Sequence, residues 1–220
     1  DPDQTVMPDL GSLMLCPWDP RVAWFAGDIT WRDGTPFPLC ARTILKQQIA
    51  RAKDMGLQFQ VGIEPEFYLY RTGEDGRAAP MVTSDVGPCW GYDVAATVAA
   101  FPFLEDVVKC FRSMDWGIDC FVHEGGHGQY EFDYGYFDAL ESADKWILIK
   151  EMLRQVAAAH DGRVGHHTGS PDDQVARDHL TGGQFDVAVD RARHLGVQVH
   201  RSAPLGEVLQ HPLARLERDL

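Results

Sequence analysis

The stretch LQFQVGIEPEFYLY, residues 57–70, decides the fold. Its odd-numbered positions from Phe59 to Leu69 are apolar apart from Pro65, and the even positions carry glutamine, glycine or glutamate up to Glu66. This alternation with a period of two predicts a β-strand with one face in the core. Glu64 and Glu66 would then point the same way, about 6.5 to 7 Å apart along the strand. Pro65 between them predicts an edge position or a bulge.

Segments with helical periodicity lie before and after this strand in the sequence. Residues 43–55 have apolar positions three and four apart, with Thr43 as the expected N-cap and Gly56 just beyond the C-terminus. The same signs predict a helix over residues 104–114, closed by Gly117, and a long helix over 138–160. Residues 118–124 and 130–134 read as short strands around a glycine-rich turn. Helices alternating with antiparallel hairpins predict an α+β fold, an antiparallel sheet with helices packed on it.

The amino-acid composition limits the classes of partner that the protein is expected to bind. The 220 residues include 33 acidic and 20 basic side chains, a net charge of -13, which argues against nucleic acid as the main partner. No apolar run is long enough to span a membrane, so we expect no membrane partner. The five cysteines lack metal-binding spacing and predict reduced thiols in a cytoplasmic protein.

The composition changes near residue 160. All cysteines, tryptophans and tyrosines precede that point, whereas the remaining residues contain no lysine and one phenylalanine, Phe185. The sequence therefore predicts one domain over residues 1–160 and a tail of different character over 161–220.

Four glutamates, Glu64, Glu66, Glu124 and Glu131, stand where strands meet glycine-rich chain. A single glutamate is usually a solvated surface residue, but Glu64 and Glu66 interrupt a strongly apolar strand. Burying several carboxylates requires positive charge, and no Lys or Arg occurs between residues 117 and 136. An all-oxygen donor set suits Mg²⁺ or Mn²⁺. His123 and His127 are further candidates, either as metal ligands or as groups that contact the ligands.

Two segments resemble the glutamine synthetase family. GIEPEFYL, residues 62–69, resembles the family's G-x-E-x-E-F-x-L strand, and HEGGHGQYE, residues 123–131, resembles its H-E-x-x-x-x-Q-x-E segment. Shorter stretches, MPDLGSL at 7–13 and DALESAD at 138–144, are similar to the start of the catalytic domain and to the helix after the second segment. The resemblance covers residues 1–160, a partial catalytic domain.

The resemblance implies roles for the same residues. Glu66, Glu124 and Glu131 match the ligands of the family's first metal ion, and Glu64 matches a ligand of the second. His123 and Gln129 are the candidate cofactor-binding residues.

The implied activity is an ATP- and Mg²⁺-dependent ligase that joins glutamate to ammonia or an amine through γ-glutamyl phosphate. Asp133 or Tyr134 would lie at the amine end of the site, and the loop of residues 72–91 would act as a lid or reach a subunit contact.

The sequence also departs from the family. The N-terminal β-domain is not recognisable before Asp1, nor are the later metal and phosphate-binding segments beyond His160, so we expect half of an active site. The family's ring-shaped homo-oligomers are not expected without that domain. Two alternatives stay open: an inactive remnant of a family member, and a carboxylate–metal hydrolase that does not use ATP.

Overall fold

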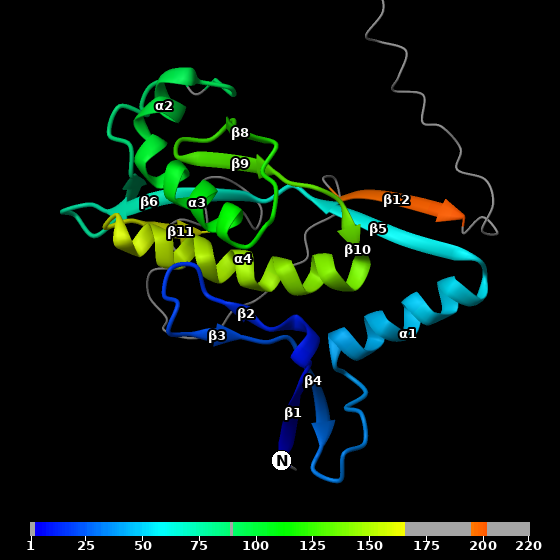
Figure 1. Ribbon diagram of the computed structural model, residues 1–220. Helices are drawn as coiled ribbons and strands as arrows, with labels where there is room; N and C mark the ends of the chain where they lie inside the picture. Colours follow the sequence, from blue (N-terminus) through cyan, green and yellow to red (C-terminus); the bar gives the residue numbers. More distant parts are fainter. Residues whose placement is uncertain (1–2, 89, 166–194, 202–220) are drawn as a thin grey trace, which may run out of the picture.

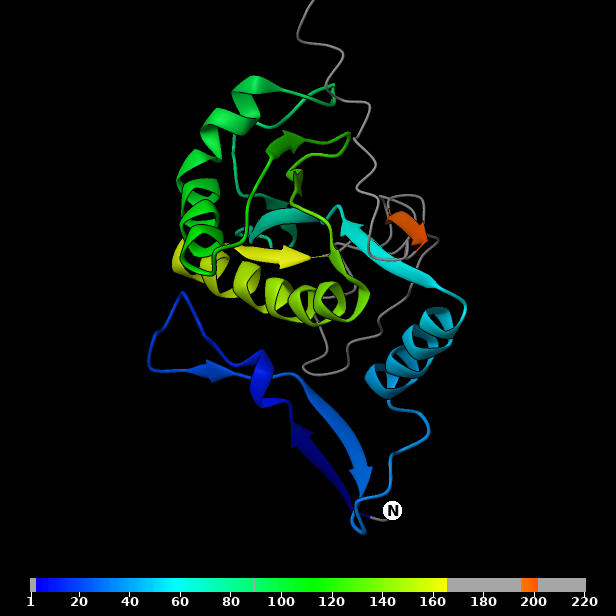
Figure 2. The same cartoon turned by 45° about the vertical axis from the view of Figure 1, so that its right-hand side comes forward.

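A computed structural model describes residues 3–88, 90–165 and 195–201. Helices α3 (Phe101–Ser113) and α4 (Ala139–Ala159) lie against a sheet, and the N-terminal strands lie on the far side of α4 (Figures 1 and 2). This mixture of helices and antiparallel strands confirms the α+β prediction.

Five antiparallel strands form the main sheet. Strands β11 (Arg163–Gly165), β6 (Glu66–Thr72), β9 (Gln129–Asp133) and β8 (Cys120–His123) follow one another, and β7 (Ala78–Pro80) also pairs with β6. Within the sheet, β9 is bonded on one side to β6 and on the other to β8. The two sequence segments that carry the glutamates are therefore neighbouring strands.

The helices follow the periodicity closely. The three predicted helices correspond to α1 (Ala41–Asp54), α3 and α4, and a short helix, α2 (Val94–Ala99), precedes α3. Gly56 has the expected positive φ of 73° after α1. Two terminal assignments were wrong: the N-cap of α1 is Cys40 rather than Thr43, and Asp115, with φ 56°, takes the left-handed position expected at Gly117.

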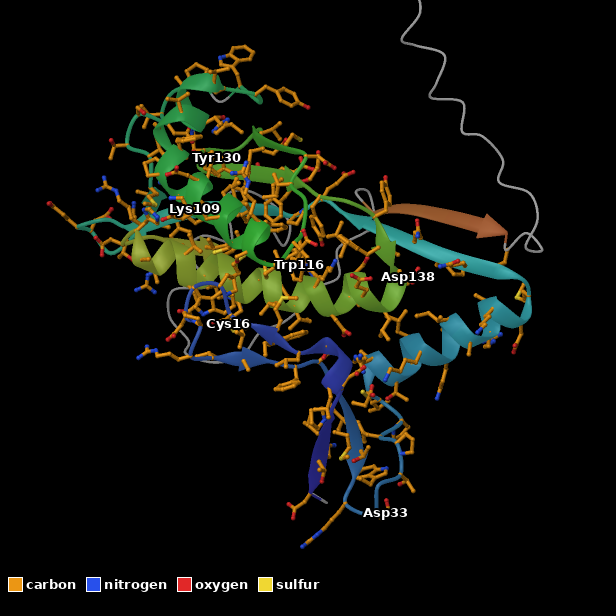
Figure 3. The ribbon with its side chains drawn as sticks, in the orientation of Figure 1. Cys16, Asp33, Lys109, Trp116, Tyr130 and Asp138 are labelled. Carbon is orange, nitrogen blue, oxygen red and sulfur yellow. The ribbon has the colours of Figure 1, made fainter. Side chains whose placement is uncertain are left out.

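The core lies between the helices and one face of the sheet. Phe67 of β6 and Phe132 of β9 are fully buried, as are Phe111 of α3 and Leu153 of α4. The rings of Phe111 and Phe132 meet edge to face, with centroids 5.1 Å apart. Tyr130, marked in Figure 3, lies on the same face and is also fully buried. Burial of these large side chains is the main source of stability.

The predicted strand of residues 57–70 is two strands. β5 (Leu57–Ile63) ends before Glu64, and its partners are β10 (Phe137–Asp138) and β12 (Leu195–Arg201), not the partners of β6. The expectation of one continuous strand was wrong because Pro65 has no N–H for a ladder bond. Its carbonyl still accepts a hydrogen bond from the Phe132 amide, at 3.3 Å.

The N-terminal segment forms small antiparallel pairs. β1 (Gln4–Pro8) pairs with β4 (Gly27–Trp31), and β2 (Met14–Leu15) pairs with β3 (Ala23–Trp24), with a 3₁₀ turn at Leu10–Ser12. Every residue of β1 is exposed. The segment is joined to the rest of the chain by Arg42 of α1, whose guanidinium bridges carboxylates from three parts of the chain.

Most of the predicted tail lies outside the described residues. β11 continues the main sheet past residue 160, and β12 pairs with β5 over seven positions. The boundary at residue 160 stays a prediction. The described cysteines, Cys16, Cys40, Cys110 and Cys120, are free thiols. None of the described helices combines the length and apolar character needed to cross a bilayer.

Candidate metal centre

The face of the main sheet opposite the core carries acidic side chains. Because side chains alternate along a strand, Glu66 of β6 and Glu131 of β9 lie on that face while Phe67 and Phe132 lie on the core face. Glu66 and Glu131 are direct cross-strand partners, which brings their Cβ atoms to about 5 Å.

Glu64 reaches the same place from the break between β5 and β6. Carboxylate oxygens of Glu64, Glu131 and Asp133 lie within 4.8 Å of one another. Asp133, expected at the amine end of the site, is thus a member of the carboxylate group itself. One of its oxygens is buried and has no hydrogen-bond partner among the described residues.

Glu124 joins the group from the turn after β8. Its backbone amide donates to the carbonyl of Gln129 at 2.9 Å, which closes the turn, and its side chain shares a hydrogen bond with Glu131. The structure thus brings together the four glutamates singled out in the sequence, together with Asp133.

The carboxylates of the group act on one another electrostatically. Burial raises the pKa of Glu131 to about 8, and the hydrogen bond with Glu124 and the charges of Glu124, Asp133 and Glu66 act in the same direction. A divalent cation would offset this effect, because its positive charge favours the ionised form of Glu131. The all-oxygen donor set fits Mg²⁺ or Mn²⁺.

Gln129 orients one of the glutamates. Its Nε2 donates to Oε2 of Glu66 at 2.8 Å, and its Oε1 accepts from the hydroxyl of Tyr68 at 3.2 Å. The side-chain amide is therefore held between β6 and β9 at the edge of the carboxylate group. Contact between Gln129 and a cofactor stays a prediction.

The structure does not bring His123 to the carboxylates. Its side chain is 1% exposed and lies on the core face, with its ring centroid 5.4 Å from that of Tyr130. His123 Nε2 and His127 Nδ1 each lie 3.0 Å from an oxygen of Asp85. Through these nitrogens, both imidazoles face Asp85 rather than the four glutamates. The cofactor role expected for His123 stays a prediction.

Asp85 was not singled out from the sequence. It lies in the loop between β7 and α2 and is buried, although nothing distinguishes it in sequence from the other acids of residues 72–91. Burial acts to raise the pKa of Asp85, but hydrogen bonds from His123, His127 and the Gly128 amide outweigh it and lower the pKa. Its role depends on contacts distant in sequence, which no local pattern signals.

Close packing affects two glycines of the turn, and at Gly128 the backbone itself requires glycine. Gly128 has a φ of 71°, and a Cβ there would lie 2.7 Å from the carbonyl oxygen of Leu69. A Cβ on Gly126 would lie 2.8 Å from the hydroxyl of Tyr68. The positive φ and the backbone contact therefore explain the glycine at position 128.

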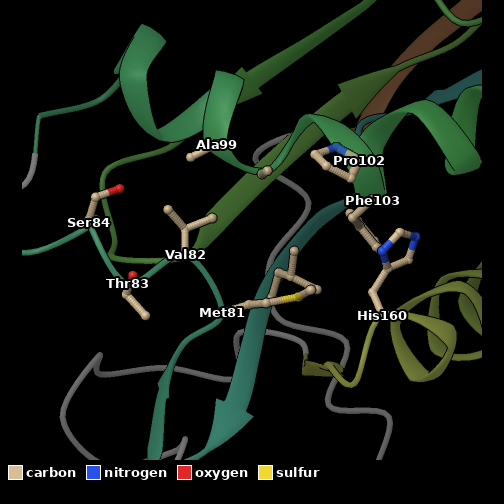
Figure 4. Close-up of a pocket in the computed structure, with 10 residues that line it drawn as sticks. Met81, Val82, Thr83, Ser84, Ala99, Pro102, Phe103 and His160 are labelled. Atoms are coloured by element: carbon tan, nitrogen blue, oxygen red, sulfur yellow. The ribbon is translucent and has the colours of Figure 1, made fainter.

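A hollow elsewhere in the molecule is not lined by the carboxylates. It has a volume of about 250 Å³ and lies where the residue 81–84 loop meets α2 and α3, as Figure 4 shows. Met81, Val82, Phe103 and His160 are among its lining residues. Polar and apolar groups contribute to its walls to a similar extent, and it does not share the acidic face of the sheet.

Comparison with known families gives one match over most of the described chain. Residues 38–168 match the family profile described as glutamine synthetase, catalytic domain. This range contains all four glutamates and Asp133.

Individual relatives agree with the profile. The chain is 34% identical over 161 residues to a glutamine synthetase of Clostridium saccharobutylicum and 30% identical over 163 residues to one of Rhizobium meliloti strain 1021. These alignments cover 72% and 74% of this chain but 36% and 37% of the relatives. The chain thus spans about a third of the length of the curated relatives it matches.

Solved structures show the same similarity in three dimensions. One described as a GmaS/ADP complex, conformation 1, is 33% identical with a TM-score of 0.69, and the match covers 74% of this chain and 37% of that one. Another, described as a novel glutamine synthase homolog, is 26% identical with a TM-score of 0.61 and has the same coverage of both chains.

Proposed function

The chain belongs to the glutamine synthetase family, and on that premise we propose that it supplies the metal-binding part of an ATP-dependent ligase site. The proposed reaction joins glutamate to ammonia or an amine through γ-glutamyl phosphate. The observation that carries this proposal is the convergence of Glu64, Glu66, Glu124 and Glu131 on one face of the sheet.

Each glutamate has a proposed part. Glu66, Glu124 and Glu131 would hold one divalent cation, and Glu64 would contribute to a second. Mg²⁺ or Mn²⁺ bound there would neutralise phosphate oxygens, from which most of the catalysis of phosphoryl transfer derives. The chain's own contribution is positional: Gln129 holds the Glu66 carboxylate, and the turn of residues 124–129 fixes Glu124.

The nucleotide and the location are also part of the proposal. The similar solved structure described as an ADP complex supports an adenine nucleotide as co-substrate. The free thiols of the described cysteines support a reducing compartment, and we place the reaction in the cytoplasm.

A Mn²⁺ titration followed by electron paramagnetic resonance tests the metal site. We expect the full chain to bind Mn²⁺ and Glu66→Ala to weaken binding by about tenfold or more, because affinity depends on the number of charged ligands. Glu74→Ala, which removes the same charge from an exposed loop position, is the matched control and should bind as the native chain does. Equal affinity of the Glu66→Ala and native chains would contradict the proposal.

A phosphate-release assay tests the chemistry. Release that requires ATP, glutamate and Mg²⁺ together supports a ligase, whereas Mn²⁺ binding without turnover supports the inactive remnant. Metal-dependent hydrolysis that proceeds without ATP would identify the carboxylate–metal hydrolase instead.

A further inference from the structure

Asp85 is a buried carboxylate bound by one short segment of chain. Its side chain is 6% exposed. His123 Nε2 lies 3.0 Å from Oδ2, His127 Nδ1 lies 3.0 Å from Oδ1, and the amide of Gly128 donates to Oδ2. A carboxylate accepts hydrogen bonds, so both imidazole nitrogens carry the hydrogen in these contacts. All three donors come from residues 123–128, which are the last residue of β8 and the turn that leads to β9.

These bonds hold the turn at both ends. His123 directly precedes Glu124, and Gly128 directly precedes Gln129. Asp85 thereby fixes the backbone at the two points from which the side chains of Glu124 and Gln129 leave. Glu124 shares a hydrogen bond with Glu131, and Gln129 donates to Glu66. One carboxylate on the core side therefore contacts the sequence neighbours of two groups on the acidic side.

The loop that carries Asp85 is itself anchored. The Asp85 amide donates to the carbonyl of Val82 at 3.1 Å, and the Val82 side chain is buried in the core. Further along the same loop, the amide of Tyr92 donates to the carbonyl of His123 at 2.6 Å. Asp85 is thus a fixed reference for the turn rather than a mobile side chain.

We infer that Asp85 is a positioning residue for the metal centre, acting through the turn of residues 123–129 on Glu124 and, by way of Gln129, on Glu66. The inference rests on the proposed function, because it assigns Asp85 a part in the same cation site. Groups behind metal ligands typically change metal affinity by about 10–100-fold when they are removed. A carboxylate needed for stability alone would not change affinity in this way.

The test uses Asp85→Ala and Asp85→Asn in the full chain, with Asp144→Ala as the matched control. Asp144 is another largely buried carboxylate, 17% exposed, paired with Arg42 away from the turn. The readouts are Mn²⁺ affinity, hydrogen exchange of the Gly128 and Gln129 amides in the metal-free protein, and melting temperature. Asp85→Asn retains one acceptor oxygen and the side-chain shape, so it serves if Asp85→Ala does not fold.

We expect Asp85→Ala to weaken Mn²⁺ binding by about tenfold and to speed exchange at Gly128 and Gln129, with a smaller change for Asp85→Asn. Asp144→Ala should lower the melting temperature and leave affinity and exchange as they are. Native affinity and native exchange in both Asp85 variants would overturn this inference alone. A native chain that binds no Mn²⁺ would overturn the proposed function, and with it the assignment of Asp85 to a metal centre.

Discussion

Glu131 lies at the centre of the group of acidic side chains. It is paired across the ladder with Glu66, shares a hydrogen bond with Glu124 and lies against Glu64 and Asp133. Because these surroundings raise the pKa of Glu131, its carboxyl group is protonated near neutral pH in the metal-free protein. Metal binding should therefore be accompanied by proton release. The same arrangement that favours metal binding costs stability in the metal-free protein.

That cost gives a pH-dependent prediction. The pKa of Glu131 is raised from 4.5 to about 8 in the folded chain, so its contribution to stability is complete below about pH 4.5 and is lost as pH rises through about 8. Glu131→Gln stays neutral at every pH. We expect it to stabilise the metal-free protein by about 1 kcal/mol near pH 9, after allowance for solvent screening, and to have little effect near pH 4.

Urea unfolding in the presence of a chelator, at both pH values, measures the difference. Glu74→Gln, at an exposed position, should leave stability unchanged at each pH and serves as the control. A stability difference between Glu131→Gln and the native chain that does not vary with pH would show that Glu131 titrates normally.

At the scale of elements, α4 shows what periodicity predicts well. Its inward stripe includes Leu153, which is fully buried, while Ile147 on the outward side is 53% exposed. We expect Leu153→Ala to cost about 2–5 kcal/mol through lost burial and a cavity, and Ile147→Ala to cost under about 1 kcal/mol. Equilibrium unfolding in urea compares the two variants, and similar losses would mean that α4 does not pack on the sheet through this stripe.

The elements also show where sequence reasoning stops. The period of 3.6 located α1, α3 and α4, and the period of two located the strands around Glu66 and Glu131, because both patterns record which face is buried. The break at Pro65 gave no sign that β5 and β6 would take different partners, since pairing depends on distant chain.

The same limit applies to the candidate site. The four glutamates could be chosen because they interrupt apolar strands and lie in recognisable segments. Asp85 could not be chosen in this way, because its contact with His127 spans 42 residues of sequence. The place of Asp133 among the ligand candidates could not be predicted either, because it depends on contacts across the sheet. Placing His123 on the core face likewise required the observed strand register, which pairs it with Tyr130.

At the scale of the whole molecule, the sheet separates two environments. Its core face packs on α3 and α4, and its opposite face gathers the carboxylates, so the apolar packing that stabilises the fold also fixes the positions of the acidic groups. Of the N-terminal strands, β2 and β3 place Met14 and Trp24 against this core, whereas β1 is exposed throughout. The β1–β4 pair adds no side chain to the core and is joined to the rest of the chain by polar contacts. Arg42, with its side chain 10% exposed, supplies the main one.

Arg42 connects three parts of the chain. Its guanidinium lies 2.7 Å from Asp9 before the 3₁₀ turn, 3.1 Å from Asp28 of β4 and 3.0 Å from Asp144 of α4. Arg42→Ala removes the partner that Asp9 and Asp144 share, while Asp28 keeps its contact with Lys46. The attachment of the N-terminal strands to α4 is therefore weakened. Because β1 and β4 bury no side chain in the core, we expect the loss of Arg42 to release them locally rather than to unfold the whole chain.

Limited proteolysis tests this expectation. Arg42→Ala should be cleaved within residues 3–40 at least about tenfold faster than the native chain, while the part that contains α3, α4 and the main sheet stays resistant. Arg51→Ala, on the same helix and bonded at the exposed surface to Gln48, is the matched control and should be cleaved at the native rate. Equal cleavage of the Arg42→Ala and native chains would mean that the N-terminal strands are held by their own packing, and that the three carboxylates around Arg42 contribute little to the attachment.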